Sequence, residues 1–241
     1  MLISSLHNLK IKEITKLHEK KYRDKTNTFL IEGKHLVLEA YKLGLLKELI
    51  IEKEEILPLN VDTLFVTKDI LRKISQTNSP STIMGVAYKK KEESLGERIL
   101  ILDDIQDPGN LGTIIRSAVA FGIDTIVISP NTVDLYNDKV IRSTQGMIFH
   151  INIIVRELKP FIEYLRQECY KIVGTNVRSG TDVKDAKIYS HYALIVGNEG
   201  QGIKDEISNL CDETIIIKMA RGCESLNVAV ATSIILYEVS T

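Results

Sequence analysis

The stretch that decides the fold is "RILILDDIQDPGNLGTIIRSAVAFGIDTIVIS", residues 98–129. It opens with an apolar run that ends in two acidic residues, turns through Pro-Gly-Asn, and closes with a second apolar run. Between the two runs, Leu111, Ile114, Ile115 and Ala118 recur at helical spacing and should face a core. A strand, a helix and a strand in this order predict two parallel strands joined by a covering helix.

The same alternation continues toward the C-terminus. Apolar segments at 151–155, 171–177, 192–199 and 213–219 alternate with helical patterns, and a last helix is predicted over 226–239. Strands that are apolar throughout indicate a parallel sheet with helices on both faces, and so an α/β fold. Ligands of such sheets bind beyond the carboxyl ends of the strands, so functional residues should lie in the loops that follow strands.

A charged, glycine-containing segment, "YKKKEESLGER" at residues 88–98, has the composition of a linker. It separates a small α/β domain, residues 1–92, from the larger domain, residues 99–241. The net charge is +4 over residues 1–98 and −5 over the remainder. This asymmetry indicates either a basic surface on the first domain or ordinary variation between domains.

Cysteine usage and hydropathy exclude several classes of protein. Cys169, Cys211 and Cys223 are far apart and lack metal-site spacing, which predicts reduced thiols in a cytoplasmic protein without a bound metal. Lys10 and Lys12 precede any long apolar run, which argues against a signal peptide. No apolar run approaches the roughly 18 residues needed to span a membrane.

The loop after the first strand carries an unusual arginine. Asn110 is predicted to cap the helix N-terminus. Gly112 and Arg116 are four residues apart and share a helix face, so the guanidinium could lie near the free N–H groups of the first turn. That arrangement suits an anion such as a phosphate, although a solvated surface arginine is the alternative.

Two further loops follow buried strands. Glycines at the end of the strand at 192–199 would let a ligand or another backbone segment approach closely; they are Gly197, Gly200 and Gly202. Glu199 is the charged residue of that turn. After the strand at 213–219, Ser225 is predicted to cap the last helix, and Asn227 could be a second local cap.

Together these loops resemble the SpoU (TrmH-like) family of RNA ribose methyltransferases. The family motifs N-x-G-x-I-x-R, G-x-E-x-x-G and I-P-M…S-L-N-V are matched, in order, by Asn110, Gly112, Ile114 and Arg116; by Gly197, Glu199 and Gly202; and by Ile217, Met219 and Ser225 to Val228. Lys218 stands where the family has proline, which could loosen the cofactor loop. The resemblance covers residues 99–241, and residues 21–40 are similar to the family's small substrate-binding domain of the ribosomal L30e-type (L30e-like) fold.

This resemblance implies a SPOUT-type fold with a C-terminal trefoil knot that binds S-adenosylmethionine, in a homodimer whose active site is completed across the interface. The implied activity is methylation of a ribose 2′-hydroxyl in structured RNA, ribosomal RNA rather than transfer RNA by family analogy. The implied cofactor contacts are Thr175, Asn176, Gly197, Gly202, Ile217, Met219 and Leu226. Two alternatives stay open: a catalytically silent RNA-binding module, and a nucleotide-dependent α/β enzyme of another class.

The implied catalytic residues are Arg116, Asn110, Glu199, Ser225 and Asn227. In the family the arginine is often proposed as a general base, but a guanidinium stays protonated in proteins. We therefore expect Arg116 to hold an RNA phosphate while another group accepts the proton. Ser225 would orient the hydroxyl or the phosphate, and the remaining residues would hold Arg116 and the loops in place.

The basic N-terminal stretch supports an RNA partner. Residues 1–25 contain seven Lys and Arg residues against Glu13, Glu19 and Asp24. Four of the basic side chains are predicted to contact RNA phosphates; they are Lys10, Lys20, Lys21 and Arg23. A solvated helix face is the alternative interpretation.

Overall fold

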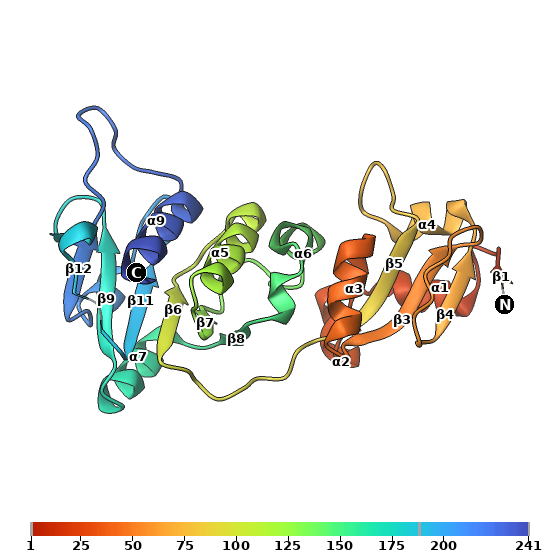
Figure 1. Ribbon diagram of the computed structural model, residues 1–241, viewed down its shortest axis with the longest axis horizontal. Coiled ribbons are helices and arrows are strands. Elements are labelled where there is room, and N and C mark those ends of the chain that lie inside the picture. Colours follow the sequence, from red (N-terminus) through yellow and green to blue (C-terminus); the bar gives the residue numbers. More distant parts are fainter. Residues whose placement is uncertain (1, 188, 241) are drawn as a thin grey trace. The chain divides into compact units, whose positions relative to one another are not determined.

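The computed structural model describes residues 2–187 and 189–240 and divides the chain into two compact units (Figure 1). The N-terminal unit comprises residues 1–91 and 136–149, and the C-terminal unit comprises residues 92–135 and 150–241. The predicted boundary placed 136–149 in the larger domain. The structure groups this segment with the N-terminal unit because the Phe29 ring contacts Tyr136 at 4.8 Å and Phe149 at 5.9 Å between centroids.

The N-terminal unit is built on a mixed sheet with the strand order β1-β4-β3-β5-β2. Strand β4 is parallel to β1 and β3, whereas β5 is antiparallel to β2 and β3. Its strands are β1 (Leu2–Ile3), β2 (Thr28–Glu32), β3 (Leu46–Glu52), β4 (Thr63–Val66) and β5 (Ile83–Tyr88). Apolar side chains of α1 (Leu9–Lys16) and α4 (Lys68–Ile74) pack on this sheet, among them the buried Ile11, Ile14 and Ile70.

Local sequence sets the ends of the helices in this unit. Asn27 adopts a left-handed conformation (φ 53°) that ends α2, and Gly33 (φ 106°) precedes α3 in a conformation that favours glycine. The helices are α1 (Leu9–Lys16), α2 (Lys20–Thr26), α3 (Lys34–Lys42), α4 (Lys68–Ile74) and α6 (Asp138–Thr144), with a 3₁₀ turn at Met147–Phe149. The basic N-terminal stretch therefore forms two short helices, α1 and α2.

The C-terminal unit contains the predicted parallel sheet, with the strand order β10-β12-β9-β11-β6-β7-β8 (Figure 1). Every pairing in it is parallel, which confirms the α/β prediction. The strands are β6 (Arg98–Leu102), β7 (Thr125–Ile128), β8 (Asn152–Val155), β9 (Lys171–Asn176), β10 (Thr181–Asp182), β11 (Tyr192–Val196) and β12 (Glu213–Ile216). The two-residue edge strand β10 was too short to be predicted from periodicity.

Helices cover both faces of this sheet. On one face, Ile162 of α7 and Ile207 of α8 pack against Ile99 and Ile101 of β6. On the other, α5 and α9 lie side by side (Figure 1), and the Ser117 and Ser233 hydroxyls are 2.7 Å apart. The helices are α5 (Pro108–Ala120), α7 (Leu158–Gln167), α8 (Asp205–Ser208) and α9 (Val228–Ser240), with a 3₁₀ turn at Val183–Asp185.

The strand order decides where the three loops meet. Strand β11 lies between β6 and β9, and β12 pairs with β9. All of these strands run in the same direction, so the loops that follow β6, β11 and β12 leave the same edge of the sheet. Among the described residues, no helix is long and apolar enough to cross a membrane.

Candidate active site

The first loop starts helix α5 in a way that frees Asn110. The prediction that Asn110 is the N-cap is wrong. Asp107 caps the helix, because its carboxylate accepts a hydrogen bond from the Asn110 backbone N–H at 2.9 Å and Pro108 occupies the first helical position. With the cap supplied three residues earlier, the Asn110 side chain can bond elsewhere.

That side chain joins the first loop to the second. Asn110 Nδ2 donates to Glu199 Oε1 at 3.0 Å. The same carboxylate accepts the backbone N–H of Asp107 at 3.0 Å and of Gln106 at 3.2 Å. Glu199 therefore pins the start of α5 to the glycine loop after β11, although about 90 residues separate them in the chain.

The third loop is tied in through Asn227. Its Nδ2 donates to Asn110 Oδ1 at 2.9 Å, and its Oδ1 accepts the backbone N–H groups of Ala229 at 3.0 Å and Val230 at 3.3 Å. Asn227 is thus the N-cap of α9, and the prediction that Ser225 caps this helix is wrong. The hydrogen-bond chain Glu199–Asn110–Asn227 connects all three loops.

The surroundings of Glu199 favour its ionised form. Partial burial acts to raise the pKa of this carboxyl, but the hydrogen bonds from Asn110 and from the backbone of Asp107 and Gln106 outweigh it, so the pKa lies below the ordinary glutamate value. A carboxylate that accepts these donors is a weak base. Its chemistry suits holding the loops together rather than accepting a proton.

Replacing Glu199 with glutamine should destabilise the C-terminal unit. The amide keeps one acceptor oxygen but presents its NH₂ to backbone N–H donors, so at least one donor loses its acceptor. We expect the free energy of unfolding to fall by about 1–3 kcal/mol, measured by urea denaturation near neutral pH. Glu206→Gln is the matched control, because Glu206 is exposed on α8 and should change stability little.

The stability difference should also depend on pH. The folded-state pKa of Glu199 is lowered, so its carboxylate contributes stability above the unfolded-state pKa of about 4.3, and this contribution is lost as the pH falls through the folded-state pKa. The wild-type and Glu199→Gln stabilities should therefore converge at low pH. A gap that stays constant between neutral and acidic pH would contradict this role of the ionised carboxylate.

An ion-pair cluster that sequence reasoning missed holds the base of the same loops. Lys204 Nζ lies 2.6 Å from Asp104 Oδ2 and 3.3 Å from the buried Asp103 Oδ1, and the Lys204 backbone N–H donates to Asp103 Oδ2 at 2.9 Å. The pair with Asp104 raises the pKa of Lys204. Ser129, after β7, donates to Asp104 at 2.6 Å. Asp103 and Asp104, at the end of the first strand, were the only hint of this cluster in the sequence. Their partner Lys204 could not be identified, because it lies about 100 residues further along the chain.

The glycine loop folds back on itself at Gly197. Asn198 and Gly202 exchange two backbone hydrogen bonds of 3.0 Å, and a Cβ on Gly197 would lie 2.1 Å from the Gly202 carbonyl carbon and the Ile203 nitrogen. Gly202 has φ +73°, a conformation that favours glycine. The glycine cluster was expected to allow close approach of either a ligand or another backbone segment. At Gly197 it is another backbone segment that approaches.

Arg116 and Ser225 stand apart from this network. Arg116 is exposed on α5, and among the described residues it makes no hydrogen bond or ion pair. The expectation that Asn110, Glu199 and Asn227 hold Arg116 by direct contact is therefore wrong. These three side chains form hydrogen bonds with one another and with the backbone of the loops. Ser225 is exposed, and its carbonyl accepts a hydrogen bond from Cys223 Sγ at 3.5 Å.

The expected cofactor contacts lie at the ends of β9, β11 and β12. Thr175 Oγ1 donates to the Ile195 carbonyl at 3.0 Å, and Asn176 Oδ1 accepts the Arg178 backbone N–H at 2.8 Å. After β12, the backbone of Lys218 and Met219 makes no backbone hydrogen bond within residues 2–187 and 189–240. Half-buried apolar side chains flank this free backbone; they are Ile217, Met219 and Leu226.

Lys218, in the position of the family proline, is held by an ion pair. Its Nζ lies 3.0 Å from Asp182 Oδ2. Strand β10 places Asp182 beside Ile216, two residues before Lys218, through its parallel pairing with β12. The expectation that Lys218 loosens the loop left out this contact, because a two-residue edge strand gives no periodic signal.

The predicted RNA contacts differ in their surroundings. Lys20 and Lys21 are exposed on the first turn of α2, whereas Lys10 pairs with Glu48 at 3.0 Å. Arg23 is buried, and its Nη1 donates to the carbonyls of Leu17 at 2.8 Å and His18 at 2.6 Å. The prediction that Arg23 grips a phosphate conflicts with this placement, because its guanidinium joins α1 to α2. The three cysteines are free thiols.

Comparison with known families shows which families the two parts of the chain resemble. The SpoU rRNA Methylase family matches residues 97–237, and the MRM3-like substrate binding domain matches residues 8–85. The relative described as 23S rRNA (guanosine(2553)-2'-O)-methyltransferase RlmP, from Bacillus subtilis (strain 168), is 39% identical over 241 residues, which cover 98% of this chain and 97% of the relative.

Solved structures resemble the whole chain. The AdoMet-bound rRNA methyltransferase from Sinorhizobium meliloti has a TM-score of 0.87 at 30% identity, covering 99% of this chain and 97% of that one. The SpoU methyltransferase AviRb from Streptomyces viridochromogenes, in complex with AdoMet, has a TM-score of 0.87 at 25% identity, covering 97% of each chain.

Proposed function

This chain belongs to the SpoU rRNA methylase family, and from that membership we propose that it transfers a methyl group from S-adenosylmethionine to the 2′-hydroxyl of a guanosine in 23S ribosomal RNA. The observation that carries the proposal is the hydrogen-bond chain Glu199–Asn110–Asn227, which gathers the three loops at one sheet edge. The Bacillus subtilis relative supports the choice of RNA and of nucleotide. Because ribosomal RNA is the substrate, we place the protein in the cytoplasm.

The residues at the ends of β9, β11 and β12 fit S-adenosylmethionine. The backbone of Lys218 and Met219 offers hydrogen-bonding groups that no described backbone group uses, and half-buried Ile217 and Leu226 provide an apolar surface for an adenine ring. Thr175, Asn176, Gly197 and Gly202 would complete the contacts. When bound, the cofactor supplies a methyl group already activated on a sulfonium. The trefoil knot around this site remains part of the proposal.

The protein must then position a weak nucleophile, because an alcohol attacks only when it is well aligned. The exposed guanidinium of Arg116 would hold the RNA phosphate beside the target ribose, with the bidentate geometry that arginine offers to phosphates. Ser225 would orient the ribose hydroxyl. Glu199 would hold the loops in place, because its carboxylate oxygens already accept hydrogen bonds from both loops. The proton of the ribose hydroxyl would pass to solvent water.

We further propose that two copies of the chain associate through α9. Its side chains Val230, Ile234 and Tyr237 are exposed and lie at helical spacing on one face. A contiguous exposed apolar face of this kind favours a protein interface. The second copy would complete the active site as the family resemblance implies, and sedimentation equilibrium of the purified chain would measure the association.

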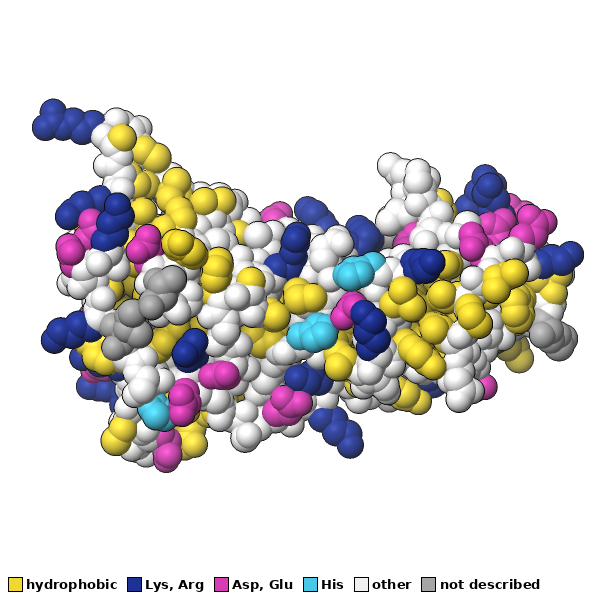
Figure 2. Space-filling model, viewed as in Figure 1, with side chains coloured by type: hydrophobic (Ala, Val, Ile, Leu, Met, Phe, Trp, Pro, Cys, Tyr) yellow, Lys and Arg dark blue, Asp and Glu magenta, His cyan; other side chains and the backbone are white. Residues whose placement is uncertain are grey.

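The N-terminal unit would supply RNA affinity through local basic groups. On the face shown in Figure 2, basic and acidic side chains are interspersed. Exposed Lys20 and Lys21 on α2 are candidates for phosphate contacts. In the double variant Lys20→Ala/Lys21→Ala, we expect the slope of log Kd against log salt to decrease by about 1 per lysine, measured by filter binding to 23S rRNA. Lys68→Ala, exposed on α4, is the control, and equal slopes in all proteins would contradict the assignment.

The function is tested by methyl transfer. Purified protein and labelled S-adenosylmethionine should methylate 23S ribosomal RNA taken from cells that lack this protein, and ribose-methylation mapping should locate one guanosine. Transfer to transfer RNA alone would favour the alternative substrate. RNA binding without transfer would favour a silent binding module, and calorimetric binding of NAD or ATP without S-adenosylhomocysteine would favour an enzyme of another class.

A further inference from the structure

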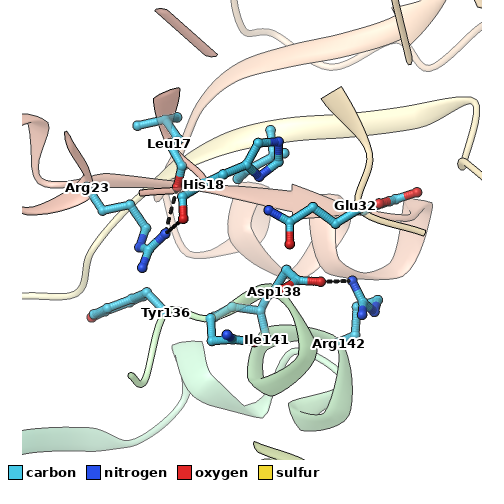
Figure 3. A pocket seen from close by; sticks show the side chains of 11 residues that line it. Leu17, His18, Arg23, Glu32, Tyr136, Asp138, Ile141 and Arg142 are labelled. Carbon is cyan, nitrogen blue, oxygen red and sulfur yellow. Dashed lines mark hydrogen bonds and ion pairs between the residues drawn. The ribbon is translucent and has the colours of Figure 1, made fainter. Parts of the chain in front are cut away.

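The N-terminal unit contains a pocket that the proposed function does not use (Figure 3). One wall comes from the end of α1, from α2 and from β2, with Leu17, His18 and Glu32. The facing wall comes from segment 136–149, with Tyr136, Asp138 and Arg142 (Figure 3). The pocket is thus formed by parts of the sequence that lie far apart, namely residues 17–32, Gln76 and residues 136–142.

The formal charges around this pocket are balanced and already engaged. Arg23 donates to the carbonyls of Leu17 and His18, and Arg142 donates to Asp138 at 2.5 Å. The Glu32 carboxylate accepts hydrogen bonds from the hydroxyls of Ser75 and Thr77 and from the Ser81 backbone N–H. Two guanidinium groups face two carboxylates, so the pocket suits neither a phosphate nor a metal cation.

The remaining polar groups suit a neutral ligand. Burial lowers the pKa of His18, against the opposing effect of a hydrogen bond with the Ile74 backbone, so the imidazole is neutral near pH 7 and can offer a lone pair. Gln76 is exposed at the rim, on the loop that Glu32 anchors, and its amide can both donate and accept. Apolar surface comes from Leu30 and Ile141.

We propose that this pocket binds one nucleobase of the RNA substrate, an inference that rests on the proposed function for the identity of the partner. A nucleobase is flat and neutral, and its edge carries donors and acceptors that such groups can pair with. The adjoining phosphates would lie outside, where exposed Lys20 and Lys21 follow His18 closely in the chain. Inside, the carboxylates of Glu32 and Asp138 would repel a phosphate.

The test uses the full chain labelled at isoleucine methyl groups for NMR. Titration with the 5′-monophosphates of adenosine, guanosine, cytidine and uridine, and with a short single-stranded RNA, should shift the Ile141 signal. Ile162, which packs in the core of the C-terminal unit, is the internal control and should not move. No shift of Ile141 with any nucleotide or with the RNA would overturn the proposal.

The RNA affinities of matched variants then test whether the base that binds in the pocket belongs to RNA. Gln76→Ala removes a proposed contact with the base, and Arg142→Ala leaves the Asp138 carboxylate without its Arg142 partner beside the RNA. Each should weaken RNA binding about two- to tenfold. Asn78→Ala on the same loop and Arg72→Ala, whose Asp69 pair resembles the Asp138–Arg142 pair, should leave affinity unchanged. An equal loss of RNA affinity in all four variants would overturn the proposal that an RNA base occupies the pocket. So would nucleotide binding in the pocket combined with unchanged RNA affinity in the Gln76→Ala and Arg142→Ala variants. These readouts need no methyl transfer, so failed methylation with a shifted Ile141 would count against the proposed function alone.

Discussion

Arg116→Ala should lower methyl-transfer turnover by about 10²–10³-fold while the affinity for S-adenosylmethionine stays the same. The guanidinium is exposed and makes no hydrogen bond or ion pair within the described residues, so its removal should not disturb the Glu199–Asn110–Asn227 chain or the fold. Its loss removes a bidentate charged contact that would be available to an RNA phosphate. Single-turnover methylation of 23S ribosomal RNA and calorimetry with S-adenosylhomocysteine measure the two quantities.

Two further variants sharpen this test. Arg116→Lys keeps the charge but loses the planar fork, so we expect turnover between that of the wild type and that of the alanine variant. Arg166→Ala is the matched control, because Arg166 lies on α7 and pairs with Asp212 on the other side of the sheet from α5. If Arg116→Ala instead abolished cofactor binding and spared RNA binding, the arginine would belong to the cofactor site.

Gly197→Ala should destabilise the C-terminal unit by at least about 3 kcal/mol, the upper end for overpacking a core. The added Cβ would lie 2.1 Å from two backbone atoms, the Gly202 carbonyl carbon and the Ile203 nitrogen. A side-chain neighbour could rotate away, but this backbone is fixed by the paired hydrogen bonds between Asn198 and Gly202. Relief would have to move the loop that carries Glu199, so cofactor and RNA binding should fall together.

Gly200→Ala provides the comparison within the same loop. Its Cβ would meet only the Asn198 Oδ1 atom at 3.7 Å, an ordinary van der Waals distance, so we expect a change within about 0.5 kcal/mol. Thermal unfolding of the three proteins measures the effect: about 3 kcal/mol corresponds to a fall in Tm of roughly 6–12 °C in a chain of this size. Equal Tm values for Gly197→Ala and the wild type would show that the loop backbone does not pack on Gly197.

The sequence by itself determined the sheet and the identity of the site loops. Apolar segments that alternate with helical spacing require a covered parallel sheet, because each buried strand must hide both faces. The residues at the strand ends then share one edge, so the three loops were expected to meet there. Asn110, Glu199 and Asn227 were named as site residues through the resemblance to the family motifs. These features follow from near neighbours in the chain.

The tertiary structure alone decided which partner each polar side chain has. Asn110 leaves its local cap to Asp107 and bonds Glu199 and Asn227, and Arg23 is buried against two carbonyls instead of facing solvent. Segment 136–149 has a helical pattern, yet it packs in the N-terminal unit because the Phe29 ring contacts the rings of Tyr136 and Phe149. The local sequence determines the backbone conformation of a residue only within a segment of about one helical turn. Its partner depends on groups brought close by folding, and their separation in the chain leaves no periodic trace.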